Sequence, residues 1–338
     1  MITVKKNRTE TFLKYFNIIQ TAGVFLLIFL FLTIAYPSFC TSRNIANLIN
    51  QLSTTLIIAA GVTIILIAGE IDISVGSIVG LAGIVGGVVV KQYGIVAGYS
   101  AALIIGLLVG IFNGVITIKG HIPSFITTLG TMRMARSLCY VFSGGLIIGD
   151  FPDKFNIIGQ QDIFGIPWLL ICVVIVFVVM YISMRKTSFG QYVYAVGSNK
   201  EASILSGINS DLVKIKSFAI SGLLAGFAGI LTASRVMAIG PDSGTGLEFE
   251  VIAGVVIGGT SMAGGIGNVL QSIIGVLIIG MIRNGINLSE LNIFWNDFVT
   301  GGVIIIAVLL DTFRQYASSK IEEKSYLKKA NNNGENNE

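Results

Sequence analysis

Long apolar runs alternate with short polar connections along almost the whole chain. A helix needs about 20 mostly apolar residues to cross a bilayer, with a range of about 17–25. By that criterion the pattern predicts an all-α membrane protein with about ten transmembrane helices. The predicted spans are residues 18–36, 48–68, 75–90, 95–118, 124–142, 167–184, 213–234, 247–262, 268–287 and 296–311.

Two of these spans contain related segments, "IIGLLVGIFNGVI" (104–116) and "IIGVLIIGMIRNGI" (273–286). Both begin Ile-Ile-Gly and end on Asn-Gly before a branched apolar residue. The first copy lies in the fourth span and the second in the ninth, so they are expected to cross the membrane in opposite directions. The pattern predicts an inverted repeat, with spans 2–5 mirrored by spans 7–10, as in many transporters.

The composition is typical of a surface that faces lipid. Of the 338 residues, 53% are hydrophobic and only 12% are charged, whereas soluble domains carry about 25% charged residues. The 41 glycines suit membrane helices that pack closely. His121 is the only histidine, and the three cysteines are scattered without metal or redox spacing. The net charge of +4 is spread over loops, so we expect no nucleic-acid partner.

The distribution of Lys and Arg favours one orientation. If the N-terminus is cytoplasmic, most basic residues outside the spans fall in cytoplasmic segments, chiefly 1–17, 185–216 and 312–338. The positive-inside rule therefore places both termini in the cytoplasm. The predicted outer loops hold only Arg43, Lys91, Lys154 and Arg235.

Three parts of the chain follow from this orientation. Residues 1–17 form a basic cytoplasmic N-terminus and residues 18–312 form the transmembrane domain. Residues 313–338 are polar and are expected to be a disordered cytoplasmic tail.

Two carboxylates interrupt the apolar stretch "LIAGEIDISVGSIVG" (66–80) between the second and third spans. In one interpretation, Asp72 or Ser74 caps the third span by accepting from its first free N–H groups. In the other, the helix is broken near the floor of a cavity, and Glu70 or Asp72 faces the transport pathway. Both interpretations can hold together.

One cytoplasmic loop, residues 185–216, is much longer than most others. Its "SNKEASILSGIN" portion predicts a short helix that starts at Ser198 and stops at Gly207. Such a helix is either interfacial or a docking surface. The chain has no Walker A sequence, so its energy source is either an ion gradient or ATP hydrolysis by a partner.

Several motifs together resemble the membrane permease of ribose-type ABC importers, over about residues 18–312. They are "GEIDISVGSIVGLAG", "GHIPSFITTLGTM", "GQYVYAVGSNKEASILSGIN", "SGLLAGFAGILTASR" and "VIAGVVIGGTSMAGGIGNVLQSIIG". The resemblance implies a type II-importer-like fold in a bacterial inner or plasma membrane. It also implies two permease chains, identical or closely homologous, that form the pore.

The same resemblance implies further partners but no catalytic residue and no cofactor in this chain. A separate ABC ATPase subunit would hydrolyse ATP with magnesium, and an extracytoplasmic binding protein would deliver a monosaccharide, with ribose the first candidate. Residues Gly197–Asn209, within a coupling loop of about 185–212, would form the helix that docks the ATPase. The contact candidates are Gly197, Asn199, Glu201, Ala202, Leu205, Ser206 and Gly207.

Transport of this kind proceeds by alternating access. A sugar needs a hydrated, weakly polar path, which amide, hydroxyl and aromatic side chains could line. The alternative for each is bonding or packing between helices. Arg133 and Arg136 have two possible roles: they pair with buried carbonyl or carboxylate groups, or they extend to the cytoplasmic interface. The acidic outer loop 240–250 either docks the binding protein or is a solvated loop. The pathway candidates are Phe112, Asn113, Thr127, Thr128 and Asn284.

Two rival functions remain open. An ion-coupled secondary transporter would place paired carboxylates in mid-span, whereas the acidic residues here fall at the ends of predicted spans. A membrane scaffold or receptor subunit would need no inverted repeat. Within the importer hypothesis the solute also stays open among ribose, xylose, galactose, a furanone signal and a nucleoside, because the binding protein sets specificity.

Overall fold

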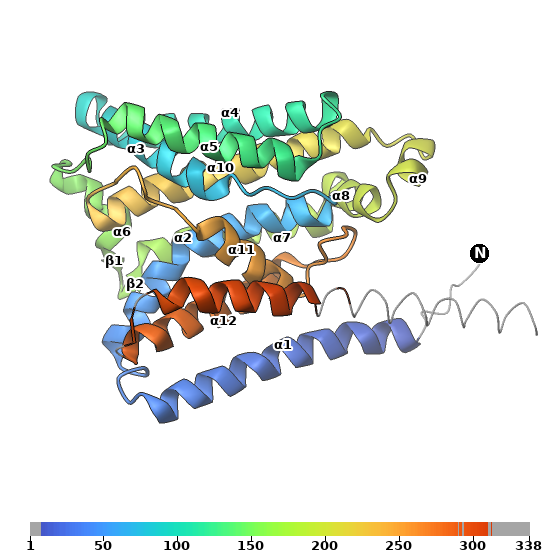
Figure 1. Ribbon diagram of the computed structural model, residues 1–338, viewed down its shortest axis with the longest axis horizontal. Helices are drawn as coiled ribbons and strands as arrows, with labels where there is room; N and C mark the ends of the chain where they lie inside the picture. The colour runs from blue at the N-terminus through green and yellow to red at the C-terminus, as the bar shows by residue number, and fades with distance from the viewer. Residues whose placement is uncertain (1–7, 290, 293, 310–311, 313–338) are drawn as a thin grey trace, which may run out of the picture.

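The chain is almost entirely helical (Figure 1). The structure is a computed structural model, and it describes residues 8–289, 291, 292, 294–309 and 312. Residues 1–7 of the predicted N-terminal segment and the predicted tail 313–338 lie outside the described residues.

Each of the ten predicted spans coincides with a helix, so the predicted all-α membrane architecture is confirmed. Six described helices are long and apolar enough to cross a bilayer. The helices that match the predicted spans are α1 (Arg8–Ala35), α2 (Ser42–Ile67), α3 (Val75–Tyr93), α4 (Ile95–Lys119), α5 (Ser124–Ser143), α7 (Trp168–Lys186), α10 (Ser210–Val236), α11 (Leu247–Ile257), α12 (Val269–Leu288) and the C-terminal helix Trp295–Leu309.

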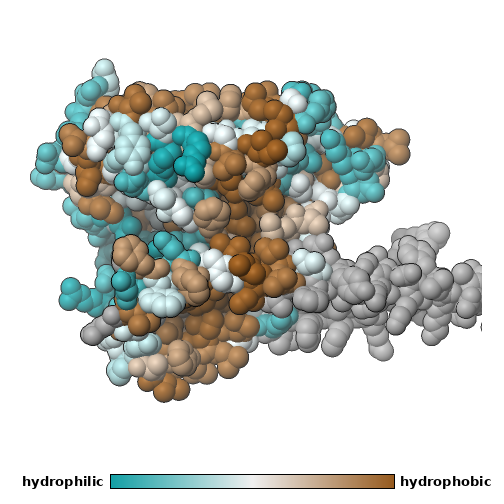
Figure 2. All heavy atoms as spheres, viewed as in Figure 1, coloured by the Kyte–Doolittle hydropathy of each residue, from teal (hydrophilic) through white to brown (hydrophobic). Residues whose placement is uncertain are grey.

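The short elements gather at two opposite ends of the bundle (Figure 1). One end, the hairpin end, carries a 3-10 turn (Asp153–Phe155), α6 (Asn156–Gln160) and the antiparallel strands β1 (Asp162–Ile163) and β2 (Ile166–Pro167). The other, the α9 end, carries α8 (Ser188–Ser198) and α9 (Lys200–Leu205). Between them, Figure 2 shows apolar side chains across the middle of this face and polar ones toward both ends, as a bilayer-spanning protein requires.

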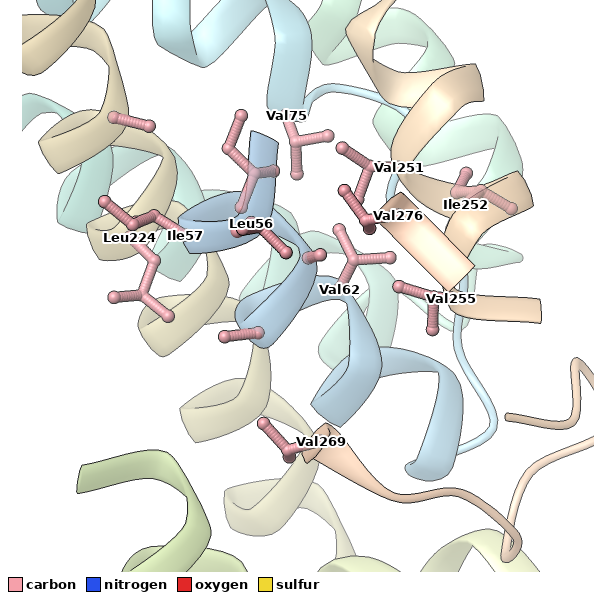
Figure 3. Close-up of a cluster of buried hydrophobic side chains, with 14 of the residues drawn as sticks. Leu56, Ile57, Val62, Val75, Leu224, Val251, Ile252, Val255, Val269 and Val276 are labelled. Atoms are coloured by element: carbon pink, nitrogen blue, oxygen red, sulfur yellow. The ribbon is translucent and has the colours of Figure 1, made fainter. Parts of the chain in front are cut away.

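Helix α10 lies at the centre of the bundle and packs against α2, α3 and α4. Its contact with α4 depends on glycine, because a Cβ at Gly106 would lie 2.2 Å from the carbonyl oxygen of Gly222. A second part of the core joins α2 to α11 and α12. There Val62, Val251 and Val276 point toward one another (Figure 3).

The two copies of the sequence repeat run in opposite directions, as predicted. Near its C-terminal end, α4 reaches the α9 end, where Lys119 pairs with Asp211 at the start of α10. The corresponding end of α12 reaches the hairpin end, where Asn284 bonds Asn44 at the start of α2. Helices α4 and α12 are therefore antiparallel.

In each half of the inverted repeat, the second helix (α3 in the first half, α11 in the second) starts inside the bundle, after a non-helical segment. Glu70 bonds Lys214 near the start of α10, whereas Gly83 of α3 lies against Gly229. Lys214 and Gly229 are fifteen residues apart on α10, so the two contacts lie about 22 Å apart along the helix at 1.5 Å per residue. Figure 1 shows segment 68–74 running as an extended chain from the level of Glu70 to the start of α3, and the first turns of α3 cover the rest of the interval. We call segment 68–74 the first break, and residues 237–246, between α10 and α11, the second break.

Several predicted boundaries are wrong: α1 begins at Arg8 and not at residue 18, and α2 begins at Ser42 and not at residue 48. The helix predicted over 247–262 ends at Ile257, because Gly258 and Gly259 begin a turn in which Gly259 has a φ of +95°. The docking helix starts after Asn199 and not at Ser198, which is the last residue of α8. Helix α8 itself was not predicted.

Candidate functional site

Helix α9 projects from its end of the bundle (Figure 1). The Asn199 side chain caps it by accepting from the backbone N–H of Ala202 at 2.8 Å. Gly207 then turns the chain away with a φ of +81°. Leu205 is 89% exposed and Ile204 is 52% exposed. Two exposed apolar side chains on a helix of six residues are typical of a protein contact.

The predicted contact residues divide into two groups. Glu201, Ala202, Leu205, Ser206 and Gly207 are all exposed at the tip, and the Ser206 hydroxyl donates to the carbonyl oxygen of Ala202. Gly197 lies in α8 and faces the bundle, where a Cβ would lie 1.8 Å from the carbonyl oxygen of Ile67. Sequence reasoning missed Ile204, although its position beside Leu205 on a predicted surface helix was a usable signal.

Helix α8 joins α9 to the ends of two core helices. The Tyr194 hydroxyl donates to the carbonyl oxygen of Gly267 at 2.9 Å, just before α12. Gly197 of α8 packs against the carbonyl oxygen of Ile67 at the end of α2, and the same oxygen accepts from the N–H of Gly265 at 2.8 Å. Burial raises the pKa of Tyr194. Helix α8 therefore connects α9 to the end of α2 and to the segment just before α12.

A chain of hydrogen bonds holds the first break. Asn113 Nδ2 of α4 donates to Ser74 Oγ at 2.8 Å, and Ser74 Oγ donates to Asp72 Oδ1 at 2.6 Å. The same Asp72 oxygen accepts from the backbone N–H of Ser74 at 2.8 Å. All three side chains are fully buried. Asp72 thus accepts a hydrogen bond from the backbone just before α3. The Ser74 side chain makes no capping bond to that helix.

Helix α5 holds the same break from its other side. The Ser124 hydroxyl accepts from the N–H of Ile71 at 3.1 Å, and the Thr128 hydroxyl accepts from that of Ile73 at 3.3 Å. Thr127 is buried, and its hydroxyl has no hydrogen-bond partner among the described residues. The structure therefore brings Asp72, Ser74, Asn113 and Thr128 into one buried polar cluster around the first break.

Helix α5 also holds the second break. Arg136 Nη1 donates to the carbonyl oxygens of Pro241 and Ser243 at 2.6 and 2.8 Å. The Tyr140 hydroxyl donates to Asp242 at 2.5 Å. Arg136 therefore pairs with buried carbonyl groups and does not extend to the cytoplasmic interface, which was the other interpretation. Arg133, one turn earlier, is exposed and has no hydrogen bond or ion pair to the described residues.

The acidic loop 240–250 is mostly not an outer surface. Glu248 and Glu250 are 5% and 9% exposed at the start of α11. Glu250 forms an ion pair with Arg283 of α12, and Glu248 lies against Gly76 at the start of α3. The acidic residues do fall at helix ends, as expected, but these helix ends are buried in the bundle.

The remaining candidates lie apart from this cluster. Asn284 exchanges amide hydrogen bonds with Asn44 at 2.9 and 3.1 Å, and Phe112 is 44% exposed. Glu70 forms an ion pair with Lys214 at 2.5 Å, with both side chains largely buried. Sequence reasoning missed this partner. Lys214 starts a predicted span on the cytoplasmic side, where Glu70 was also expected, and that position was a usable signal.

The two breaks place irregular backbone inside a bundle of membrane-spanning length. Among the described residues, no group of three or more His, Cys, Asp and Glu side chains could hold a metal ion. Irregular backbone at membrane depth is tolerated where protein buries it or where it lines a cavity. Two such breaks in the two halves of an inverted repeat are typical of transporters.

Comparison with known proteins agrees with this geometry. Residues 44–308 match the model of a family described as branched-chain amino acid transport system / permease component. The ribose import permease protein of Haemophilus influenzae is 37% identical over 315 residues, which cover 91% of this chain and 98% of that protein. The ribose import permease protein of Bacillus subtilis is 38% identical over 301 residues, covering 87% and 94%.

An L-arabinose ABC transporter permease protein of Azospirillum brasilense is 36% identical over 295 residues, covering 86% of each chain. No solved structure matches significantly. The family match spans well over half of this chain, and the relatives align over most of their length. The chain therefore belongs to this family of permease components and is a multi-pass membrane protein of a bacterial transport system.

Proposed function

We propose that this chain is the permease subunit of an ATP-driven importer of a monosaccharide, with ribose as the first candidate. The names of the ribose and arabinose permeases that resemble it support this substrate class. The observation that carries the mechanism is α9, an exposed helix linked through α8 to the end of α2 and to the segment just before α12. The chain itself binds no cofactor, and ATP and magnesium are used by the partner.

In this proposal the ATPase docks on the tip of α9 through Leu205, Ile204 and Glu201. Closure of two ATPase domains moves α9, and α8 transmits the displacement to the core. A second permease chain completes the pathway, which opens alternately to the two sides. The α9 end is cytoplasmic, since Lys119, Arg185, Lys186 and Lys200 gather there. An extracytoplasmic binding protein delivers the sugar at the hairpin end.

The polar cluster around the first break is the proposed floor of the sugar pathway. Asn113 Oδ1 and Thr127 Oγ1 have no partner among the described residues. Buried polar atoms of this kind are hydrogen-bonded in most proteins. We assign these two atoms to transient contacts with sugar hydroxyls in a conformation in which the cluster opens. Phe112 and Asn284 are weaker candidates, because the first is displayed on the surface and the second is already paired.

The test is a pull-down of the detergent-solubilised permease with its cognate ATPase, combined with sugar uptake in reconstituted vesicles. Leu205→Ser removes the most exposed apolar side chain of α9 and should abolish both association and uptake. Leu146→Ser is the matched control, because Leu146 is 71% exposed at the hairpin end. Normal association of Leu205→Ser would refute the docking site. Uptake that persists without the ATPase would instead favour an ion-coupled transporter.

A further inference from the structure

An apolar groove of about 570 Å³ lies on the side of the bundle between α2, α7 and α12. Helix α7 contributes the largest part of its wall, including Val174, Phe177 and Val178, and α2 and α12 contribute Leu52 and Leu277. All three helices are long and apolar enough to span a membrane, and α7 is the least buried of the six such helices. The groove therefore opens toward lipid.

The groove offers almost nothing to a polar ligand. Its polar members are Ser53 and Tyr181, and the Ser53 hydroxyl already donates to the carbonyl oxygen of Ile49 at 2.7 Å. A sugar or an extended peptide would lose hydrogen bonds to water here without replacing them. Only a hydrocarbon chain or an apolar side-chain surface suits the walls.

The length of the groove suits a hydrocarbon chain. Along α7 the groove extends from Leu170 to Tyr181, which is about 16 Å at 1.5 Å per residue. One leaflet of a bilayer has about half of the 30 Å hydrocarbon thickness, so an acyl chain has a matching length.

The charges at the α9 end of the groove identify the headgroup. Val174, Val178, Tyr181 and Arg185 follow one another at three- or four-residue spacing, so they share one face of α7. Arg185 and Lys186 are exposed in the last turn of α7. Neither has a hydrogen bond or ion pair to the described residues. A guanidinium at the mouth of an apolar groove is well placed to bind a phosphate.

We propose that this groove binds one anionic phospholipid from the leaflet at the α9 end. The acyl chain lies along α7 as far as Val174, between α2 and α12, and Arg185 and Lys186 contact the phosphate. Because α2 and α12 are the helices to which α8 connects, the lipid packs against the elements that would move during transport. The proposal does not depend on which solute is carried.

Native mass spectrometry of the purified permease, titrated with phosphatidylglycerol, tests the site. Val174→Trp places an indole in the groove from a side chain that is 53% exposed, so the fold is expected to survive. Val179→Trp is the matched control, because Val179 is 56% exposed on the same helix and does not line the groove. Val174→Trp should weaken the tightest bound lipid at least about tenfold, since it displaces several buried methylenes, while Val179→Trp should not.

The headgroup is tested separately with Arg185→Gln and with phosphatidylcholine as the neutral competitor. Loss of the arginine should reduce the preference for phosphatidylglycerol about fivefold and leave binding of the neutral lipid unchanged. Arg43→Gln, at the hairpin end, serves as the charge control. Equal losses in Val174→Trp and Val179→Trp would show annular lipid only, and a co-purified protein mass lost specifically in Val174→Trp would show that a protein occupies the groove. Either result would overturn the proposal.

Discussion

At the scale of single residues, the buried polar groups around the first break are arranged in series and not as independent pairs. Asn113 donates to Ser74, Ser74 donates to Asp72, and Asp72 also accepts from backbone. A buried donor left without an acceptor costs about 1–3 kcal/mol. Removing one member of the series should therefore affect stability more than its single contact suggests.

We predict that Asp72→Ala lowers the free energy of unfolding by about 1–3 kcal/mol, because the Ser74 N–H loses its acceptor. Asp72→Asn keeps a carbonyl oxygen at that place and should remain close to the wild type. Thermal unfolding in detergent measures both, and Asp153→Ala, in an exposed turn, is the control. A stable Asp72→Ala protein with altered sugar preference would indicate a pathway residue instead.

The pair Glu70–Lys214 makes a second prediction at this scale. Breaking a largely buried pair leaves one charge without its partner, so Lys214→Met should destabilise the protein by up to about 3 kcal/mol. Glu70→Gln combined with Lys214→Met removes both charges and should recover part of that loss. A double-mutant cycle of melting temperatures measures the coupling between the two sites. Additive effects would mean that the pair contributes nothing specific.

At the scale of elements, α5 is the helix that contacts both breaks through side chains. Ser124 and Thr128 hold the first break, and Arg136 and Tyr140 hold the second. Its other face displays apolar side chains such as Ile126, Met134 and Val141. Helix α5 therefore links the two halves of the inverted repeat while remaining accessible on one side.

We predict that Arg136→Met reduces uptake several-fold, because the carbonyl groups of Pro241 and Ser243 lose their donor. Arg136→Lys should retain part of the activity, since an ammonium group reproduces only part of the guanidinium contact with the two carbonyl groups. Arg133→Met is the control, because Arg133 lies one turn away and is exposed. Initial rates of sugar uptake, normalised to permease in the vesicles, give the comparison. Equal effects at both positions would point to a general loss of positive charge.

At the scale of the whole molecule, the two ends of the bundle differ in charge and shape. The α9 end carries the docking helix and most of the basic residues of the described loops, and the hairpin end carries the small antiparallel hairpin. Electrostatics favours the basic end in the cytoplasm. Orientation is a property of the entire chain, because each span alternates with the next.

We predict that Lys154→Cys is labelled by a membrane-impermeant maleimide in intact cells, whereas Glu201→Cys is labelled only after permeabilisation. The background needs Cys40→Ser, since Cys40 is the exposed native cysteine and Cys139 is buried. The two positions lie at opposite ends of the bundle. The reverse labelling pattern would invert the topology and place α9 outside, where no ATPase could dock.

The membrane class, the approximate limits of most helices and the antiparallel repeat could be predicted from the sequence alone. These follow from apolar run length and local similarity, which are properties of consecutive residues. The sequence also indicated a short surface helix near residues 198–207, because cap and stop residues act locally.

The depth of the polar residues and their hydrogen-bond partners depend on how the helices pack. In the sequence, Asp72 and Glu248 are typical of helix ends. In the structure, Asp72 precedes α3 and Glu248 lies in the first turn of α11, and both helices begin inside the bundle. Arg136 binds carbonyl groups more than a hundred residues away, and Glu70 pairs with Lys214. Helix α8 was missed although Thr187 caps its start, and its packing against Ile67 and Gly265 appears only in the folded chain. Contacts between distant segments depend on how helices pack, and hydrophobic periodicity does not encode that packing.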